Sequence, residues 1–365
     1  MSVPQVSFSE IARRLRRPSI YGLLFMLVVG SGIALMATSF GVDATLVWEH
    51  VRSANAGLFA IAVGLFYLSI VIRGWRWRVI MENASTGATG PPRVPSMAEC
   101  IQLVMIARFV DSVAWLRVGN MYRAYLASSP HPARIPHVIG TILSEHVLDA
   151  VAVFAAILAV GAYVAVRGAD IPVAPPIVAG ASSVAALAVG LTLMRRYGIR
   201  LSRKLPRRIA GIYVRLHRGV MDGLGTRRMP LLLALSMLGW VLAVARWYFI
   251  VLALGASASF PLVLFVSITN VLIASVPITP GGIGLVEPGA TAVLAIELPL
   301  TMAVAVTLAE RAISYVSVII VGAATFIGRE LVKRSHARAA RARDAAASQG
   351  QATSPASQGG SAGPS

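Results

Sequence analysis

Ionisable residues stand inside long apolar stretches of this 365-residue sequence, where a charge needs a physical reason to be present. Glu145 and Asp149 lie four positions apart, Arg246 lies in another apolar run, and Glu310 and Arg311 are neighbours in a third. A charged side chain at the centre of a bilayer costs roughly 2.5–3.5 kcal/mol on insertion scales. We therefore expect these groups to pair with one another or to line a cavity that handles protons or lipid headgroups, and both interpretations stay open.

A second candidate site is the stretch "PITPGGIGLVEPG", residues 277–289, which separates two short apolar runs. A turn of this kind exposes backbone N–H groups that a ligand can approach closely. The residues that interrupt the helix are Pro280, Gly281, Gly282 and Gly284. Glu287 follows at the start of the next run, where its carboxylate either caps the helix or binds a cationic headgroup or a proton.

The spacing of the charged residues predicts which of them need separate partners. Glu145 and Asp149 share one helical face, because residues four apart are neighbours on a helix surface, and the expected structural partner is an arginine of a neighbouring span. Adjacent residues point in different directions around a helix, so Glu310 and Arg311 each need a partner of their own. Arg246 is the natural candidate for Glu310 or for Glu287.

A second interruption, "DSVAWLRVGN", spans residues 111–120 and is flanked by Arg117 and Arg123. The planar guanidinium group of arginine binds phosphate through two parallel hydrogen bonds. One interpretation is therefore a site for a phospholipid or polyprenyl-phosphate headgroup. The alternative is that both long side chains reach out to the membrane surface.

The composition indicates an integral membrane protein. Hydrophobic residues make up 56% of the chain, charged residues make up 13%, and the mean hydropathy is +0.73, whereas soluble domains carry about 25% charged residues. The single cysteine, Cys100, excludes an intramolecular disulfide, and the six histidines show no spacing typical of metal ligands. We expect no metal and no cofactor, and we identify no catalytic residue.

Six apolar runs reach the roughly 20 residues that a helix needs to cross a bilayer. They are Ile20–Phe40, Leu58–Ile80, Val138–Val166, Ala174–Met194, Leu231–Leu254 and Leu300–Ile327. Two shorter runs, Pro261–Val276 and Leu285–Ile296, surround the Pro-Gly break. The predicted fold class is an all-α polytopic membrane protein with six long transmembrane helices and two re-entrant helical hairpins, at residues 98–128 and 260–297.

The formal net charge of +18 is concentrated in basic patches that flank the apolar runs. The patches are residues 1–19, 73–137, 195–228 and 329–344. Cytoplasmic loops carry such an excess of Lys and Arg, so we expect cytoplasmic termini, a plasma (cytoplasmic) membrane location and anionic lipid headgroups as partners of these loops, rather than nucleic acid. The segment "RGWRWR", residues 73–78, is expected to anchor at the membrane interface.

The same reasoning divides the chain into three parts: a basic cytoplasmic N-terminus (1–19), a transmembrane domain (20–328) and a tail (329–365) that is first basic and then disordered. Residues 41–57 are expected to form a loop on the outside. Residues 196–226 are expected to form one amphipathic helix on the cytoplasmic face, where their arginines meet anionic lipid.

Two halves of the transmembrane domain, about 20–166 and 174–328, are each predicted to contain two spans, a hairpin and a third span. Their charge-derived orientations are opposite. Local matches support an inverted-topology repeat: "IRGWRW" resembles "ARWYF", and "TILSEHVLD" resembles "TLAERAISY". Inverted repeats with broken helices are a recurrent plan of transporters, whose site lies near the membrane midplane.

The motif "P-x-T-P-G-G-I-G-x-x-E", from Pro277 to Glu287, resembles the hallmark of the flippase-like membrane domain of lysylphosphatidylglycerol synthases. The "RGWRW" segment, the "SEHxxD" segment that begins at Ser144, and the pair Glu310–Arg311 are also similar to its pattern. The resemblance covers about residues 20–330. It implies movement of a lipid between the two leaflets.

Two departures from that family pattern affect the expected function. The family commonly carries a Gly-Glu pair in the first hairpin, whereas this chain has Gly119 and Asn120, so a carboxylate that binds a cation or a proton is missing. The soluble aminoacyl-transfer domain is expected to be absent. This chain is therefore not expected to make lysyl-lipid.

The function that we predict is translocation of a phospholipid or polyprenyl-linked lipid between leaflets. The alternatives are a membrane glycosyltransferase or its accessory subunit, acting on polyprenyl-phosphate substrates, and a membrane scaffold that transports nothing. Enzymatic activity is the less expected outcome, because no acidic Asp-x-Asp motif stands in the loops. Membrane lipids are the expected partners, and the sequence leaves a homo-oligomer open.

Overall fold

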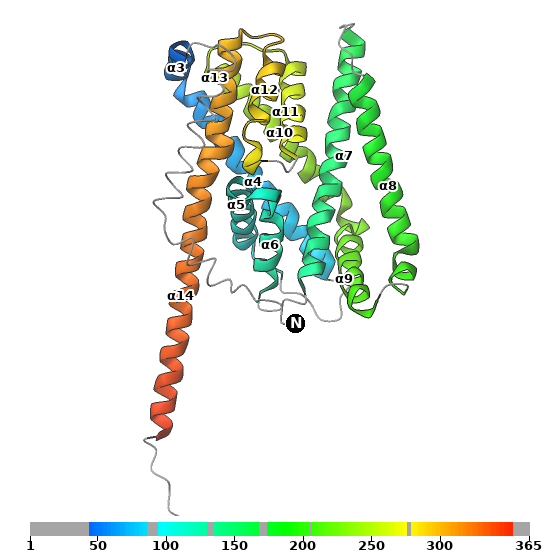
Figure 1. The fold of residues 1–365 in the computed structure, drawn as a ribbon, viewed down its shortest axis with the longest axis vertical. Coiled ribbons are helices and arrows are strands. Elements are labelled where there is room, and N and C mark those ends of the chain that lie inside the picture. Colours follow the sequence, from blue (N-terminus) through cyan, green and yellow to red (C-terminus); the bar gives the residue numbers. More distant parts are fainter. Residues whose placement is uncertain are drawn as a thin grey trace, which may run out of the picture.

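The computed structural model describes residues 44–85, 94–129, 134–167, 174–203, 206–275 and 279–352, and throughout these ranges the chain forms helices and short connections without a strand (Figure 1). The predicted all-α class is therefore confirmed for the described part. The predicted first span, Ile20–Phe40, lies outside the described residues.

Helices of very different lengths follow one another along the described chain. They are α3 (Ala44–Arg52), α4 (Ala56–Ser85), α5 (Met97–Val113), α6 (Gly119–Ser128), α7 (Ile135–Arg167), α8 (Ala174–Ser202), α9 (Arg207–Gly223), α10 (Met229–Ala253), α11 (Phe260–Ser275), α12 (Val286–Leu294), α13 (Leu300–Arg311) and α14 (Ser317–Ala352). Short 3-10 turns stand at Trp115–Arg117, Thr226–Arg228 and Pro280–Gly282, and one π-helical segment, Ala312–Val316, joins α13 to α14.

Four helical segments of the described chain are long and apolar enough to cross a membrane. They are Ala56–Ser85, Ile135–Leu158, Met229–Ala253 and Leu300–Lys333. Each coincides with an apolar run that the sequence predicted as a span. The total of six spans stays a prediction.

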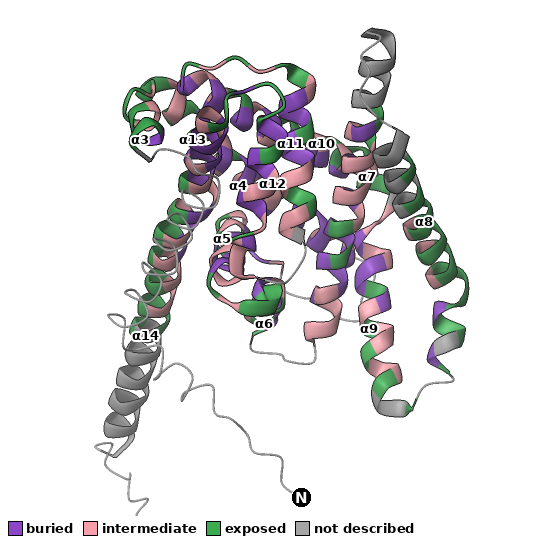
Figure 2. Ribbon diagram, turned by 45° about the horizontal axis from the view of Figure 1, so that its top comes forward, coloured by how far each residue is buried: buried purple, intermediate pink, exposed green. Residues whose placement is uncertain are grey.

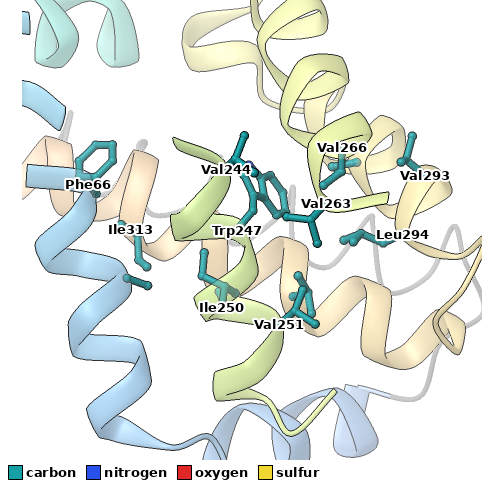
Figure 3. Close-up of a cluster of buried hydrophobic side chains, with 14 of the residues drawn as sticks. Phe66, Val244, Trp247, Ile250, Val251, Val263, Val266, Val293, Leu294 and Ile313 are labelled. Atoms are coloured by element: carbon teal, nitrogen blue, oxygen red, sulfur yellow. The ribbon is translucent and has the colours of Figure 1, made fainter. Parts of the chain in front are cut away.

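Helices α4 and α10 form the centre of the molecule, because they pack along each other and also contact the helices around them. The main hydrophobic cluster gathers side chains from both of them and from the C-terminal helices. Its members include Phe66 of α4, Trp247 of α10, Val263 of α11, Leu294 of α12 and Ile313 of the π segment (Figure 3). Figure 2 shows that α8 and α14, by contrast, carry many exposed residues. This is the burial expected where a helix surface faces lipid rather than protein.

Helices α5 and α6 form the first helical hairpin. Ser96 caps the start of α5, where its hydroxyl accepts a hydrogen bond from the Glu99 N–H (3.2 Å). The helix ends where Ala114 leaves helical geometry, and α6 begins five residues later at Gly119. Only glycine fits at this point, because a Cβ on Gly119 would collide with the carbonyl oxygen of Ala107.

Helices α11 and α12 form the second helical hairpin, and a glycine-rich turn lies between them. Gly281, Gly282 and Gly284 all have positive φ angles, of 60°, 73° and 79°, which glycine adopts without steric cost. A Cβ on Gly281 would also collide with the ring of Tyr315. The Pro-Gly stretch therefore breaks the helix, as predicted; its first two residues, 277 and 278, lie outside the described part.

The two breaks contact each other. The turn at Pro280–Gly282 contacts α5 and the turn at Trp115–Arg117, and the Tyr315 hydroxyl donates a hydrogen bond to the carbonyl oxygen of Ser112 (3.0 Å). Figure 1 shows α11 and α12 in the upper part of the molecule and α5 and α6 below them, so the hairpins approach each other from opposite ends. Their tips form the region in which the candidate site lies.

Two predicted irregular segments are helical instead. Residues 44–52, predicted as part of a loop, form α3, which packs on α13 and buries Val47. The tail was predicted to be disordered from residue 345, but α14 continues to Ala352. Alanine and glutamine make up most of residues 345–352, and both are good helix formers.

The prediction of one surface helix over residues 196–226 is wrong. Helix α8 continues to Ser202, the chain turns, and α9 begins at Arg207 and packs against α7 and α4. Close approach of the backbones allows this packing: a Cβ on Gly219 would collide with the carbonyl oxygen of His137 and would lie 3.0 Å from the Cα atom of Gly140. One face of α9 is therefore packed on other helices, while residues such as Ile209 and Ile212 remain exposed. The expected contact of this region with anionic lipid stays a prediction.

Candidate functional site

The first group of charged residues connects α4, α6 and α7. Arg123 of α6 donates a hydrogen bond to Glu145 Oε2 of α7 (2.7 Å), and Arg76 Nη2 of α4 lies 3.8 Å from Glu145 Oε1. The guanidinium carbon of Arg123 lies 3.7 Å from the centroid of the Trp77 ring. Arg123 is 4% exposed, so the interpretation that it reaches out to the membrane surface is wrong.

Asp149 also belongs to this group, and Arg76 extends the group to a fourth helix. The Asp149 carboxylate accepts hydrogen bonds from Arg76 (2.6 Å) and Arg73 (3.4 Å), and Arg76 also donates to the hydroxyl of Ser236 on α10 (2.8 Å). The prediction that Glu145 and Asp149 pair with an arginine of a neighbouring span is therefore confirmed. The predicted interfacial role of residues 73–78 is wrong for Arg76, which is 2% exposed.

The second group of charged residues connects α10 and α13. Arg246 Nη1 donates a hydrogen bond to Glu310 Oε1 (2.6 Å), and the hydroxyl of Ser314 donates to the other carboxylate oxygen (3.1 Å). Glu310 is 1% exposed. Arg246 was the predicted partner of Glu310 or Glu287, and the structure selects Glu310.

Glu287 holds the glycine-rich turn in place. Its carboxylate accepts one hydrogen bond from the Gly284 N–H and one from Arg311 Nε, both 2.7 Å long, and Arg311 Nη2 donates to the carbonyl oxygen of Gly281 (3.1 Å). Glu287 therefore binds the turn just before α12, whereas the N-cap residue, Leu285, has no side-chain cap, so the capping interpretation is not confirmed. Glu287 does give Arg311 the separate partner that this residue needs. No contact tests the other interpretation, binding of a cationic headgroup or a proton.

The tip of the first hairpin differs from that of the second. Leu116 and Arg117 have positive φ angles of 64° and 50°, and both side chains are exposed. Within the described residues, Arg117 makes no hydrogen bond or ion pair, so the structure does not bring it together with the other predicted site residues. Pro280 starts the turn that faces this tip.

Sequence reasoning missed several polar residues of this region. Arg73 and Arg76 lie three positions apart in α4 and therefore on one helical face, which was the available signal for a shared carboxylate. Asp111 accepts a hydrogen bond from the Gly119 N–H (2.7 Å) and so connects the two helices of the first hairpin. Asn120 Nδ2 lies 3.3 Å from His146 Nε2.

Comparison with known proteins assigns this architecture to a family. Residues 5–322 match the family model described as the lysylphosphatidylglycerol synthase TM region. The chain belongs to this family. The match covers both hairpins and every charged residue described above, and it ends within α14.

Two archaeal relatives of this lysylphosphatidylglycerol synthase TM region protein are membrane proteins of the group named UPF0104. The relative from Methanocaldococcus jannaschii is 28% identical over 232 residues, which are 62% of this chain and 97% of the relative. The relative from Pyrococcus horikoshii is 20% identical over 320 residues, which are 80% of this chain and 92% of the relative. The family and the apolar helices together make this a membrane protein.

Proposed function

We propose that this protein moves a phospholipid or a polyprenyl-linked lipid between the leaflets of a plasma (cytoplasmic) membrane, with the headgroup passing between the tips of the two hairpins. One observation carries the proposal: two broken helices approach each other from opposite ends and meet beside buried charged residues. A polar route through hydrocarbon needs such a meeting point, because a headgroup is costly to place in lipid without partners.

The lengths of the hairpin helices support re-entrance from the two membrane faces. At 1.5 Å per residue, α11 with 16 residues is about 24 Å long and α6 with 10 residues is about 15 Å long, both less than the roughly 30 Å of a hydrocarbon core. Non-helical backbone at membrane depth is tolerated where protein or water surrounds it. In the proposed arrangement each hairpin therefore enters and leaves on the same side.

The contacts of the two halves also support an inverted repeat with six spans. Arg76 of α4 is near Glu145 of α7, and Arg246 of α10 binds Glu310 of α13. Each arginine is followed by a buried tryptophan, Trp77 or Trp247. Because α4 and α10 pack on each other at the centre, the two sets of contacts are arranged around a common helix pair. Cytoplasmic termini follow from the basic patches.

The hydrogen bond between Tyr315 and Ser112 is central to the proposed movement. It connects the helix that follows the second hairpin with the end of α5 in the first hairpin. A headgroup that passes between the tips displaces this contact, so its rupture and re-formation are the expected events of each transport cycle. Alternating exposure of a midplane site is the general behaviour of inverted-repeat transporters.

The direct test is leaflet exchange in proteoliposomes. Fluorescent phospholipids and polyprenyl-phosphates are incorporated, and the fraction reached by a membrane-impermeant quencher is followed over time. We expect faster exchange than in empty vesicles for at least one lipid. We also expect at least tenfold slower exchange for Glu287→Gln, because loss of the charged partner releases Arg311 and the turn.

Glu49→Gln is the matched control, because Glu49 is an exposed carboxylate on α3 far from the hairpin tips. It should exchange lipid at the rate of the unchanged protein. Exchange no faster than in empty vesicles for every lipid tested would refute the proposal. So would sugar transfer to a polyprenyl-phosphate by the purified protein without any exchange, which would favour the glycosyltransferase alternative.

A further inference from the structure

Within the described part of the chain, two arginines near the hairpin tips have no carboxylate partner: Arg117, which is exposed at the first tip, and Arg108. Arg108 lies on α5, three residues before Asp111, and its guanidinium group makes no hydrogen bond and no ion pair with any described residue. Its side chain is partly exposed. Other arginines of the region each bind a carboxylate: they are Arg73, Arg76, Arg123, Arg246 and Arg311.

The guanidinium group of Arg108 lies over an aromatic ring at the centre of the molecule. Its guanidinium carbon lies 5.8 Å from the centroid of Phe66, and that of Arg246 lies 5.3 Å from the same centroid. Phe66 is a buried member of the main hydrophobic cluster (Figure 3). Arg108 of the first hairpin and Arg246 of α10 therefore both lie near the Phe66 ring. In the described structure Arg246 has a carboxylate partner, Glu310.

The charges around Arg108 are mainly of its own sign. The groups that act on it are Arg73, Arg246 and Arg117, which repel it, and Asp111, which attracts it. The Asp111 carboxylate already accepts the hydrogen bond of the Gly119 N–H. An unpaired charge in such surroundings is unfavourable, and an anion that enters between the hairpins would offset it.

We propose that Arg108 binds the phosphate group of a lipid headgroup, through two parallel hydrogen bonds from its guanidinium fork. Phosphate matches this fork in shape and charge, and in a membrane it is the anionic group that most lipid headgroups carry. The inference rests on the proposed function for the assumption that the bound phosphate belongs to a membrane lipid. Binding of phosphate to Arg108 does not itself require transport. Free inorganic phosphate offers the same chemistry, so the test must distinguish the two sources.

Native mass spectrometry of the purified full chain in detergent measures this binding. The probes are phosphatidylglycerol and a diacylglycerol with identical acyl chains but no phosphate. We expect the unchanged protein to prefer phosphatidylglycerol, and Arg108→Gln to weaken phosphatidylglycerol binding by about tenfold, the effect of one charge-assisted contact. Diacylglycerol binding should not change.

Two further variants sharpen the result. Arg52→Gln removes an exposed arginine from the end of α3, outside the basic patches, and should bind phosphatidylglycerol like the unchanged protein. Arg108→Lys keeps the charge but not the fork, so its affinity should fall between those of the unchanged protein and Arg108→Gln. A thermal unfolding midpoint near that of the unchanged protein shows that each variant is folded.

The possible outcomes separate the inference from the proposed function. Competition of phosphatidylglycerol by millimolar inorganic phosphate supports the phosphate site and assigns it to the free ion, whereas resistance to that competitor supports the lipid. Equal binding of phosphatidylglycerol and diacylglycerol by the unchanged protein overturns the inference, whether or not Arg108→Gln folds. So does equal phosphatidylglycerol binding by folded Arg108→Gln. If binding depends on Arg108 but no leaflet exchange is observed, the proposed transport is refuted and the phosphate site is still supported.

Discussion

The two hairpins make the same kind of contact with different chemistry. In the second hairpin, Glu287 binds Arg311, the residue that follows Glu310. In the first hairpin, Asn120 lies beside His146, the residue that follows Glu145. Each hairpin thus contacts the helix that follows it next to a buried glutamate, but one contact is an ion pair and the other joins an amide to an imidazole.

The turns at the two hairpin tips also differ. The second hairpin turns through glycines, which adopt positive φ angles freely, and the first turns through Leu116 and Arg117, for which such angles cost roughly 1–2 kcal/mol each. At this position the first hairpin therefore makes the weaker contact and has the more strained turn, although the buried Arg123–Glu145 ion pair also holds α6 against α7. The difference indicates that the two hairpin tips need not be equally easy to displace from the helices around them.

The largest effect is expected where neither hairpin is directly involved. Glu310→Gln should reduce the free energy of unfolding by about 3–5 kcal/mol, because it leaves the buried Arg246 without a carboxylate. The measurement is the thermal or denaturant midpoint in detergent. The double variant Glu310→Gln/Arg246→Met should recover most of the loss, and no recovery would show that the ion pair is not the cause.

A slightly smaller loss is expected from stiffening the second tip. Gly281→Ala should destabilise the protein by about 3 kcal/mol, because the new Cβ collides with the Tyr315 ring and the residue keeps a positive φ angle. Gly239→Ala, in α10 with open space around the position of a Cβ, is the control and should not destabilise. An unfolding midpoint for Gly281→Ala equal to that of the unchanged protein would contradict the predicted collision.

The contact of the first hairpin can be converted into that of the second. Asn120→Glu combined with His146→Arg should form an ion pair, with a coupling free energy of about 0.5 kcal/mol in a double-mutant cycle. The value is small because His146 is exposed, and exposed pairs contribute little. If the proposed function holds, the double variant should also slow lipid exchange, while zero coupling would show that these side chains do not meet.

The smallest effect concerns the strained turn. Leu116→Gly should stabilise the folded protein by about 0.5 kcal/mol, because relief of the positive φ angle slightly exceeds the flexibility that glycine adds to the unfolded chain. Leu116 is 74% exposed, so little packing is lost. The control is Met121→Gly, at an exposed position of α6, which should destabilise the protein. A position such as Leu103 is unsuitable as a control, because it is fully buried. Destabilisation by Leu116→Gly would show that the turn is not strained.

Much of the fold was predictable because the signals are local. Apolar runs predicted α4, α7 and α10, and the Pro-Gly stretch predicted the break before α12, since glycine and proline act on their own segment. Helices α3 and α9 were not predicted as they occur. Each is settled by packing on a distant helix, α13 or α7, and nothing in a short sequence window records that contact.

The candidate site shows the same division. Apart from Asp111, its carboxylates were predicted, because a charge in an apolar run is a local anomaly. The need of Glu310 and Arg311 for separate partners was predicted as well. The absence of a carboxylate partner for Arg108 within the described structure was not predictable, because it depends on which side chains reach it from α4 and α10.

Residue order alone therefore decided that the chain forms apolar helices, where two of them break, and which charges need partners. Only tertiary packing decided that Arg246 binds Glu310, 64 residues away, that Arg123 binds Glu145, and that the two breaks face each other. The reason is physical: hydrophobic length and backbone preference act within a segment, whereas an ion pair forms only where the angles and offsets of whole helices bring two side chains within a few ångströms.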